Sequence, residues 1–175
     1  MIRLKDNRIL LRPPEPGDVN CIYDWENESS LWQVSQTLAP YSKFAIEQYI
    51  LNARQQDLFA SRELRLMIEK TEPLETIGIL DLFEIDPLNR RAGIGILIAD
   101  RERNRGFASH ALNLILPYAF KHLGLHQLYC NIGCTNETSL ALFRKFGFET
   151  CGVKKEWNRN GDNWEDEYLL QLIHK

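Results

Sequence analysis

Apolar residues along this chain follow two alternating periods, one typical of strands and one typical of helices. Short apolar runs closed by turn residues predict strands at 9–12, 64–69, 76–85, 91–99 and 127–133. Apolar positions three or four residues apart predict helices at 18–28, 44–60, 107–123 and from 135 or 136 to before Gly147. A last pair of runs, 148–156 and 164–172, flanks Asn160-Gly161 and predicts a hairpin. The alternation favours one α/β or α+β domain spanning residues 1–175.

The helix at 107–123 has the clearest apolar stripe, and Pro117 lies inside it. Because proline has no N–H to donate, we expect the helix to kink there.

Composition narrows the class of protein. The chain has 175 residues, of which 44% are hydrophobic and 26% charged, with a formal net charge of −3. This balance is typical of a soluble globular core and excludes disordered and fibrous classes. The longest uncharged apolar stretches, 92–99 and 111–120, are too short to cross a bilayer, and the first twenty residues contain no signal-peptide core. We therefore expect a cytoplasmic protein that does not span a membrane.

Cysteine and histidine spacing gives no sign of a metal centre. The four cysteines, at 21, 130, 134 and 151, include no C-x-x-C pair and are predicted to be free thiols. No histidine belongs to an H-x-x-x-H or H-E-x-x-H group, so no metal is expected. The slightly acidic balance does not predict a nucleic-acid surface, which needs clustered Lys and Arg in excess.

The segment 100–109, Asp-Arg-Glu-Arg-Asn-Arg-Gly-Phe-Ala-Ser, joins a predicted strand to a predicted helix. Gly106 allows a positive φ, and amide groups at the start of a helix attract phosphate oxygens. The segment is therefore a candidate diphosphate site. A solvated, Arg-rich turn with a helpful glycine explains the local pattern about equally well.

Two motifs together resemble a known family. Arg103-x-x-Gly106-x-Ala108 resembles the R/Q-x-x-G-x-G/A motif with which GNAT acyltransferases hold the pyrophosphate of acetyl-CoA. About thirty residues later, the segment from Asn136 to Phe148, Asn-Glu-Thr-Ser-Leu-Ala-Leu-Phe-Arg-Lys-Phe-Gly-Phe, resembles the second signature of that superfamily. Segments 11–18 and 166–169 further resemble the branch of spermidine N-acetyltransferases and ribosomal-protein N-terminal acetyltransferases.

The resemblance implies a mixed, mostly antiparallel sheet of six to seven strands flanked by about four helices. Two parallel strands, 91–99 and 127–133, part and leave backbone groups for the co-substrate acetyl-CoA. Main-chain groups near Leu97, Ile98 and Ala99 would bind the pantetheine and the acetyl carbonyl, and Asn136 would reach the ligand, although Asn is also an ordinary helix cap. The cofactor-binding residues expected are Leu97, Ile98, Ala99, Arg103, Asn104, Arg105, Gly106, Phe107, Ala108, Ser109, Asn136, Ser139, Phe143 and Lys145.

Acetylation of an amine requires removal of a proton, because an alkylammonium ion has a pKa near 10.4 and is not nucleophilic. Asp81 is in phase with Ile77 and Ile79, so on a buried face it would have apolar surroundings that favour a base. In register it matches a substrate-facing Glu of the spermidine enzymes. Glu84, on the opposite phase, is the second candidate. Either carboxylate is also explained by ordinary solvation or ion pairing.

This chain departs from the family pattern at the residue that protonates the leaving thiolate and at residues expected near the acceptor. Family members usually protonate the thiolate with a Tyr of the second signature, where this chain has Phe143; water or a hydroxyl such as that of Tyr129 could serve instead. Spermidine enzymes have acidic residues before a Pro-Tyr pair, whereas this chain reads Leu38-Ala39-Pro40-Tyr41, and Gly93 stands where a Glu is expected. A polyamine, a smaller amine or a protein N-terminus are all candidate acceptors. Assembly into a homo-oligomer is a further open expectation.

Two other features bear on the acceptor side. Trp164 is a candidate to line the acceptor pocket, although large aromatic residues belong more often to cores. Gly93 and Gly95 either leave room for the acceptor or allow close packing of an aromatic ring.

We therefore interpret the chain as an N-acetyltransferase that transfers the acetyl group directly from acetyl-CoA to a primary amine, without a covalent enzyme intermediate. The alternative is a module that binds or senses acyl-CoA without turnover, which the Phe143 substitution favours.

Overall fold

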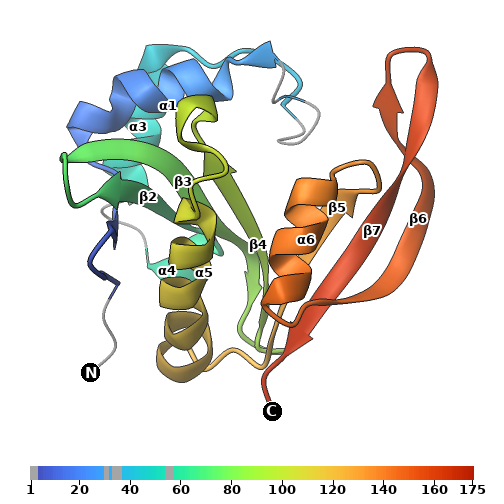
Figure 1. Ribbon diagram of the computed structural model, residues 1–175. Coiled ribbons are helices and arrows are strands. Elements are labelled where there is room, and N and C mark those ends of the chain that lie inside the picture. Colours follow the sequence, from blue (N-terminus) through green and yellow to red (C-terminus); the bar gives the residue numbers. More distant parts are fainter. Residues whose placement is uncertain (1–3, 30–31, 33–36, 54–56) are drawn as a thin grey trace.

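Seven strands form one mixed sheet in the computed structural model, which describes residues 4–29, 32, 37–53 and 57–175 (Figure 1). The strand order is β1-β2-β3-β4-β5-β7-β6, and β4 and β5 form its parallel pair. The strands are β1 Ile9–Arg12, β2 Leu64–Lys70, β3 Glu75–Asp86, β4 Arg91–Ile98, β5 Gln127–Gly133, β6 Glu149–Asn160 and β7 Asn163–Ile173. The mostly antiparallel sheet expected from the resemblance is confirmed.

Helices cover both faces of the sheet. The helices are α1 Val19–Glu26, α3 Lys43–Ala53, α4 Leu58–Ser61, α5 Phe107–Pro117 and α6 Glu137–Lys145. Helices α1 and α3 pack on one face through Ile22, Ile46 and Ile50. Helices α5 and α6 pack on the other face in the larger core cluster, which includes Leu112 and Phe143. Within the described residues, none of the helices is long and apolar enough to cross a bilayer.

Two helix predictions need correction. The helix expected at 44–60 ends at Ala53, and a separate short helix, α4, follows; residues 54–56 of the expected helix lie outside the described residues. The helix expected at 107–123 changes type at Pro117, where α5 gives way to a π-helix over Tyr118–His122. Proline removes one donor from the α-helical ladder, and this is where the α-helical pattern ends.

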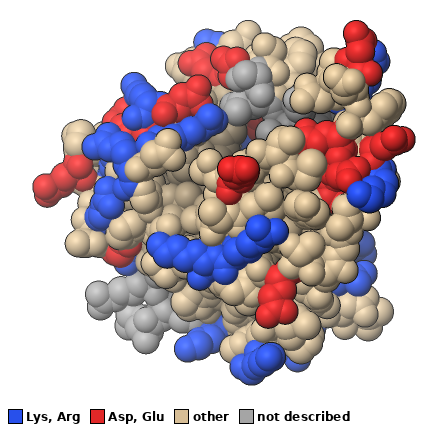
Figure 2. Space-filling model, turned by 45° about the vertical axis from the view of Figure 1, so that its right-hand side comes forward, with Lys and Arg blue, Asp and Glu red and all other residues tan. Residues whose placement is uncertain are grey.

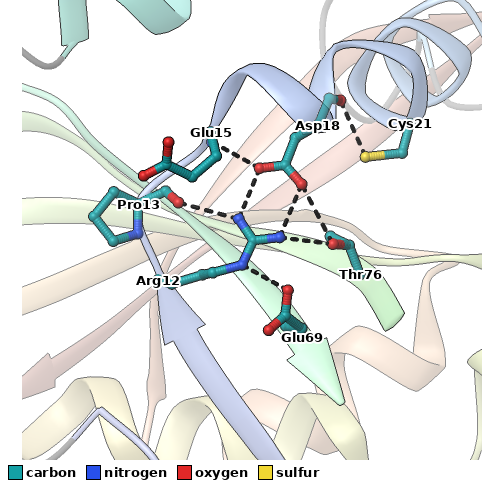
Figure 3. Close-up of polar contacts among 7 residues, drawn as sticks. All are labelled: Arg12, Pro13, Glu15, Asp18, Cys21, Glu69 and Thr76. Carbon is teal, nitrogen blue, oxygen red and sulfur yellow. Dashed lines mark hydrogen bonds and ion pairs between the residues drawn. The ribbon is translucent and has the colours of Figure 1, made fainter. Parts of the chain in front are cut away.

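A network of ion pairs ties the start of the chain to the sheet (Figure 3). The guanidinium of Arg12 lies between two carboxylates: Nη1 and Nη2 donate to Asp18 at 2.7 and 2.9 Å, and Nε donates to Glu69 at 2.7 Å. Asp18 also accepts from the amide of Glu15 at 2.7 Å and from the Thr76 hydroxyl at 3.3 Å. The network thus joins β1, β2, β3 and the turn before α1.

Asp18 is ionised at the centre of this network and only 4% exposed. Burial opposes its charge, but the hydrogen bonds from Arg12 and Glu15 outweigh burial and hold the pKa of Asp18 below its usual value. The Asp18 main-chain carbonyl accepts from the Cys21 thiol, and burial, with the Asp18 charge, raises the pKa of Cys21 to about 11. All four cysteines are free thiols, as expected.

We predict that Asp18→Asn lowers the free energy of unfolding by about 2 kcal/mol at pH 7, because the paired, charge-assisted hydrogen bonds from Arg12 to Asp18 are weakened while Arg12 keeps its bond to Glu69. The folded-state pKa of Asp18 is depressed, so its contribution is present above pH ~4 and is lost as the pH falls further. Urea denaturation should therefore show a smaller difference between wild type and variant at pH 3 than at pH 7. Asp24→Asn, at an exposed site on α1, is the matched control. A difference that persists unchanged at pH 3 would contradict the assignment.

Candidate active site

The parallel strands β4 and β5 part soon after they begin. Their pairing ends at Gly93 with Tyr129. Beyond that point β4 stays paired with β3 as far as Ile98, and β5 stays paired with β7 as far as Gly133. Each strand is therefore held from its outer side while the edges between them are open, and the expected parting is confirmed.

Main-chain groups along β4 point alternately to its two neighbours. The Ala99 amide donates to the carbonyl of Ile77 on β3 at 2.8 Å. The Leu97 carbonyl also faces β3. The groups of Ile96 and Ile98 therefore face the gap. The Ala99 amide and carbonyl already bond to Ile77 and Glu102. Contact of the main chain near Leu97, Ile98 and Ala99 with the pantetheine and the acetyl carbonyl stays a prediction.

Gly106 begins α5 in the left-handed conformation, with φ of +84°. The first backbone bond of the helix runs from the His110 amide to the Gly106 carbonyl at 3.2 Å, so the amides of Phe107, Ala108 and Ser109 have no partner within the helix. The positive end of the helix dipole adds to these free donors. The segment thus has the geometry of an anion site, and phosphate binding there stays a prediction.

A buried ion pair fixes this segment to the sheet. Glu102 and Lys70 are only 5% and 7% exposed, and Lys70 Nζ donates to Glu102 Oε1 at 3.0 Å. Arg105 Nη1 donates to the second Glu102 oxygen at 2.7 Å. Sequence reasoning missed the role of Lys70, because 32 residues separate it from Glu102 and no local pattern joins them.

Arg103 and Asn104, two further residues of the expected phosphate segment, also contribute to its local shape. Arg103 donates through Nε to the Ile98 carbonyl at 3.1 Å and pairs with Asp100 at 2.8 Å. Asn104 has a positive φ of 60°. The Arg103 side chain is nevertheless half exposed, so it can also meet a ligand.

Helix α6 borders the gap from the β5 side (Figure 1). Asn136 is its N-cap, and the side chain accepts a hydrogen bond from the Ser139 amide at 3.1 Å. Glu165 of β7 fixes the preceding turn by accepting from the Thr135 amide at 3.0 Å. The capping interpretation of Asn136 is confirmed, and contact with a ligand stays a prediction.

Two further residues of α6 differ in exposure. Phe143 is 5% exposed and meets Phe148 edge to face, with ring centroids 5.1 Å apart. Its ring therefore belongs to the core beneath the site. Lys145, at the end of α6, is exposed.

We call the sheet face opposite α5 and α6 the acceptor face, because it carries Asp81, the predicted substrate-binding residue. The Phe83 ring covers Gly93 so closely that an added Cβ would lie 2.2 Å from it, which confirms close aromatic packing at Gly93. At Gly95 the nearest Phe83 atom would be 3.9 Å from an added Cβ, so space remains there. Gly95 pairs with Asp81, which places that carboxylate beside the open position.

Asp81 lies in an ionic environment, so of the two kinds of surroundings considered for it, ion pairing is confirmed and the apolar one is not. Arg65 Nε and Nη2 donate to its two oxygens at 2.9 and 2.8 Å, and Arg65 Nη1 donates to Glu26 of α1 at 2.7 Å. The guanidinium also lies 5.4 Å from the centre of the Tyr49 ring. These partners lie far from Asp81 in the sequence, on β2, α1 and α3.

A cavity of about 240 Å³ opens beside this ion pair. Its lining includes carboxylates and aromatic rings, which suit an amine with an alkyl chain. The residues are Tyr49, Glu63, Leu64, Arg65, Asp81, Leu82 and Phe83.

Glu84, the second candidate base, interrupts the regular strand. It has a φ of +49°, within the register shift of β3 against β4 that lies between Phe83 and Asp86. Its carboxylate accepts a hydrogen bond from the Tyr129 hydroxyl. Asp81 and Glu84 are therefore both near the acceptor face, with different partners.

Trp164 does not join these groups within one copy of the chain. It lies next to the turn of the β6–β7 hairpin, which extends beyond the helices in Figure 1, and it is 60% exposed. A role in binding substrate stays a prediction without support from its position.

Charge is mixed on the surface. Figure 2 shows basic and acidic side chains interspersed on the face drawn. Among the described residues, His, Cys, Asp and Glu form no group of three suited to a metal ion.

Comparison with known proteins identifies relatives along almost the whole chain. A family model described as an acetyltransferase (GNAT) domain matches residues 8–149. Spermidine N(1)-acetyltransferase of Vibrio cholerae is 28% identical over 170 residues, which cover 95% of each chain. The crystal structure of spermidine N-acetyltransferase from Vibrio cholerae in complex with CoA and spermine matches with a TM-score of 0.84 and 25% identity, covering 96% of each chain. A dodecameric structure of that enzyme matches with a TM-score of 0.80 and 26% identity, covering 96% of this chain and 95% of that one.

We predict that Gly106→Ala weakens acetyl-CoA binding about tenfold, measured by calorimetry, because a side chain disfavours the left-handed conformation and turns the amides away. Gly161→Ala is the matched control: Gly161 has a φ of +62° in the β6–β7 turn, and no atom lies within 4 Å of an added Cβ. Both variants should lose about 1–2 kcal/mol of stability. Equal affinity in the two variants would show that the segment does not bind the ligand.

Proposed function

The chain belongs to the GNAT acetyltransferase family, and on this basis we propose that it transfers the acetyl group of acetyl-CoA to a primary amine acceptor that enters beside Asp81. The observation that carries the proposal is the parting of β4 and β5 beyond Gly93, with Gly106 opening a helix after β4. One end of the gap thus offers donors for phosphate, and its open edge offers backbone groups for an extended ligand.

The residues present fit acetyl-CoA. Backbone groups of Ile96 and Ile98 face the gap, and an N–H at this edge can hydrogen-bond the thioester carbonyl and stabilise the negative charge that develops on it. The amides of Phe107 and Ala108 suit a diphosphate. Acetyl-CoA supplies the activated acyl group, so the protein needs no nucleophile of its own.

Asp81 and its neighbours serve to attract and orient the cationic amine. Asp81, Glu26 and Glu63 carry three negative charges around the single positive charge of Arg65. This local excess favours a cationic acceptor. Because both Asp81 oxygens accept from Arg65, we assign Asp81 to positioning the amine rather than to removing its proton.

The acceptor class includes polyamines, because the matched Vibrio cholerae enzyme is a spermidine acetyltransferase. A smaller amine or a protein N-terminus is an equally good fit to this chain, since Leu38 and Ala39 precede Pro40 and are not acidic. For the same relative a dodecameric structure exists, and we propose that this chain also forms a homo-oligomer.

A second candidate function is acyl-CoA binding without turnover. Phe143 favours it, because a buried phenylalanine supplies no proton to a leaving thiolate. This candidate requires acetyl-CoA binding with no acceptor-dependent release of CoA.

A thiol-release assay with a panel of spermidine, monoamines, diamines and peptides separates the two functions. We predict release of CoA that depends on both the amine and the enzyme. Binding of acetyl-CoA without such release would establish the second candidate, and absence of binding would reject both. Saturation at 100 times Kd should stabilise the protein by about 2.7 kcal/mol, which a thermal shift detects.

In the same assay Asp81→Asn should raise KM for the amine and leave Kd for acetyl-CoA unchanged, because only the acceptor side loses a charge. Asp162→Asn, at an exposed turn far along the chain, is the control. An unchanged KM for the amine would show that Asp81 does not contribute to binding of the amine.

A further inference from the structure

Phe143 has no proton to give the leaving thiolate, so water or another side chain has to supply it. We propose, resting on the acetyl transfer proposed above, that the Tyr129 hydroxyl protonates the CoA sulfur and that Glu84 is the acid-base partner that restores its proton. Tyr129 would be a catalytic residue outside both sequence signatures, and its pairing with Glu84 would replace the tyrosine that position 143 lacks.

Tyr129 lies at the closed end of the gap. It is the residue of β5 that forms the last pair with β4, opposite Gly93. A ligand with its phosphates near Gly106 would run back along β4, which spans about 17 Å between Ile98 and Gly93 at ~3.3 Å per residue. The reacting end of such a ligand is therefore directed toward Tyr129.

The Tyr129 ring is held in place from one side. It meets Phe83 edge to face, with centroids 6.0 Å apart at 83°, and Phe83 itself lies over Gly93. A row of residues across β3, β4 and β5 thus fixes the phenol on the acceptor face. Gly95, with free space above it, lies two residues further along β4.

The hydroxyl donates to Glu84, and its electrostatic surroundings keep it protonated. Burial and then the Glu84 hydrogen bond raise the pKa of Tyr129 above its usual value, against the smaller opposing effect of Arg91. Glu84 on β3 and Arg91 on β4 are the charged groups that act on this hydroxyl. The hydroxyl is thus protonated at neutral pH. Protonation of Glu84 by the amine removes the negative charge that weakens this phenol as an acid, so proton transfer to the sulfur follows that step.

Glu84 is aimed at Tyr129 by an uncommon backbone conformation. A positive φ of 49° is disfavoured for a residue with a side chain, and residues held in such conformations cluster at functional sites. Glu84 lies within the register shift of β3 against β4, and its side chain is directed toward Tyr129. Glu84 is exposed, so it can exchange protons with the amine or with water.

The proton balance closes with these two groups. The ammonium gives one proton to the Glu84 carboxylate, the neutral amine forms the C–N bond, and the C–S bond breaks. The thiolate takes the Tyr129 proton, Tyr129 takes the proton held by Glu84, and the second nitrogen proton leaves to water. The net products are the amide, CoA thiol and one proton.

The direct test compares Tyr129→Phe and Glu84→Gln with wild type in the amine-dependent thiol-release assay. We predict that Tyr129→Phe lowers kcat about 10²-fold, with Kd for acetyl-CoA and KM for the amine unchanged. Tyr118→Phe, which removes a partly buried hydroxyl outside the site, is the control. A kcat of Tyr129→Phe equal to that of wild type overturns the proposal, while inactive wild type would instead reject the acetyl transfer on which it rests.

Two readouts separate proton donation from a merely structural hydroxyl. Replacement of Tyr129 by 3,5-difluorotyrosine, which ionises at lower pH, should move the alkaline limb of the kcat profile to lower pH. Without any substrate, Glu84→Gln should lower the pKa of Tyr129 in a tyrosinate absorbance titration, with Tyr129→Phe used to assign the signal. An unmoved alkaline limb, or an unmoved Tyr129 titration, contradicts the pairing.

Discussion

The structure depends on one constraint: β4 and β5 are each held by an outer neighbour while their facing edges separate. Main-chain N–H and C=O groups that lack partners in a protein interior raise the free energy of the folded state, so the groups at an open edge inside a sheet need water or a ligand as partner. Here β3 holds β4 as far as Ile98 and β7 holds β5 as far as Gly133, so the gap is built into the fold. The helices that begin after each strand, α5 and α6, then bring their N-termini to the same end of the gap.

Charged side chains near the candidate site maintain its shape. Lys70 and Glu102 fix the predicted phosphate segment to the end of β2, and Arg12 with Asp18 joins β1 to the turn before α1. On the other face, Arg65 of β2 bonds both to Asp81 of β3 and to Glu26 of α1, and so links these three elements. The predicted acceptor side and the predicted phosphate side thus have ion-pair networks with different members.

Periodicity was enough to predict most strands and helices, because each buries one face and the buried positions recur at the strand or helix spacing. Strands 9–12 and 127–133 match to the residue. The parting of the strands came from resemblance, since no local pattern encodes which edges stay unpaired. The sequence left the surroundings of Asp81 undecided between apolar and ion-paired, because its partner Arg65 and the carboxylate of Glu26 approach it only in the folded chain. The direction of the main-chain groups at Leu97 and Ala99 depends on how β4 is aligned with β3. The sequence does not determine this alignment to within one residue, and a shift of one residue reverses the direction.

Residue-resolved amide hydrogen exchange, with and without acetyl-CoA, tests the open edge most directly. The Ile96 and Ile98 amides face the gap, whereas the Ala99 amide already donates to Ile77. Saturating acetyl-CoA should slow exchange at Ile96 and Ile98 well beyond any change at Ala99. Equal exchange at Ile96 and Ile98 in the free and saturated protein would contradict the account.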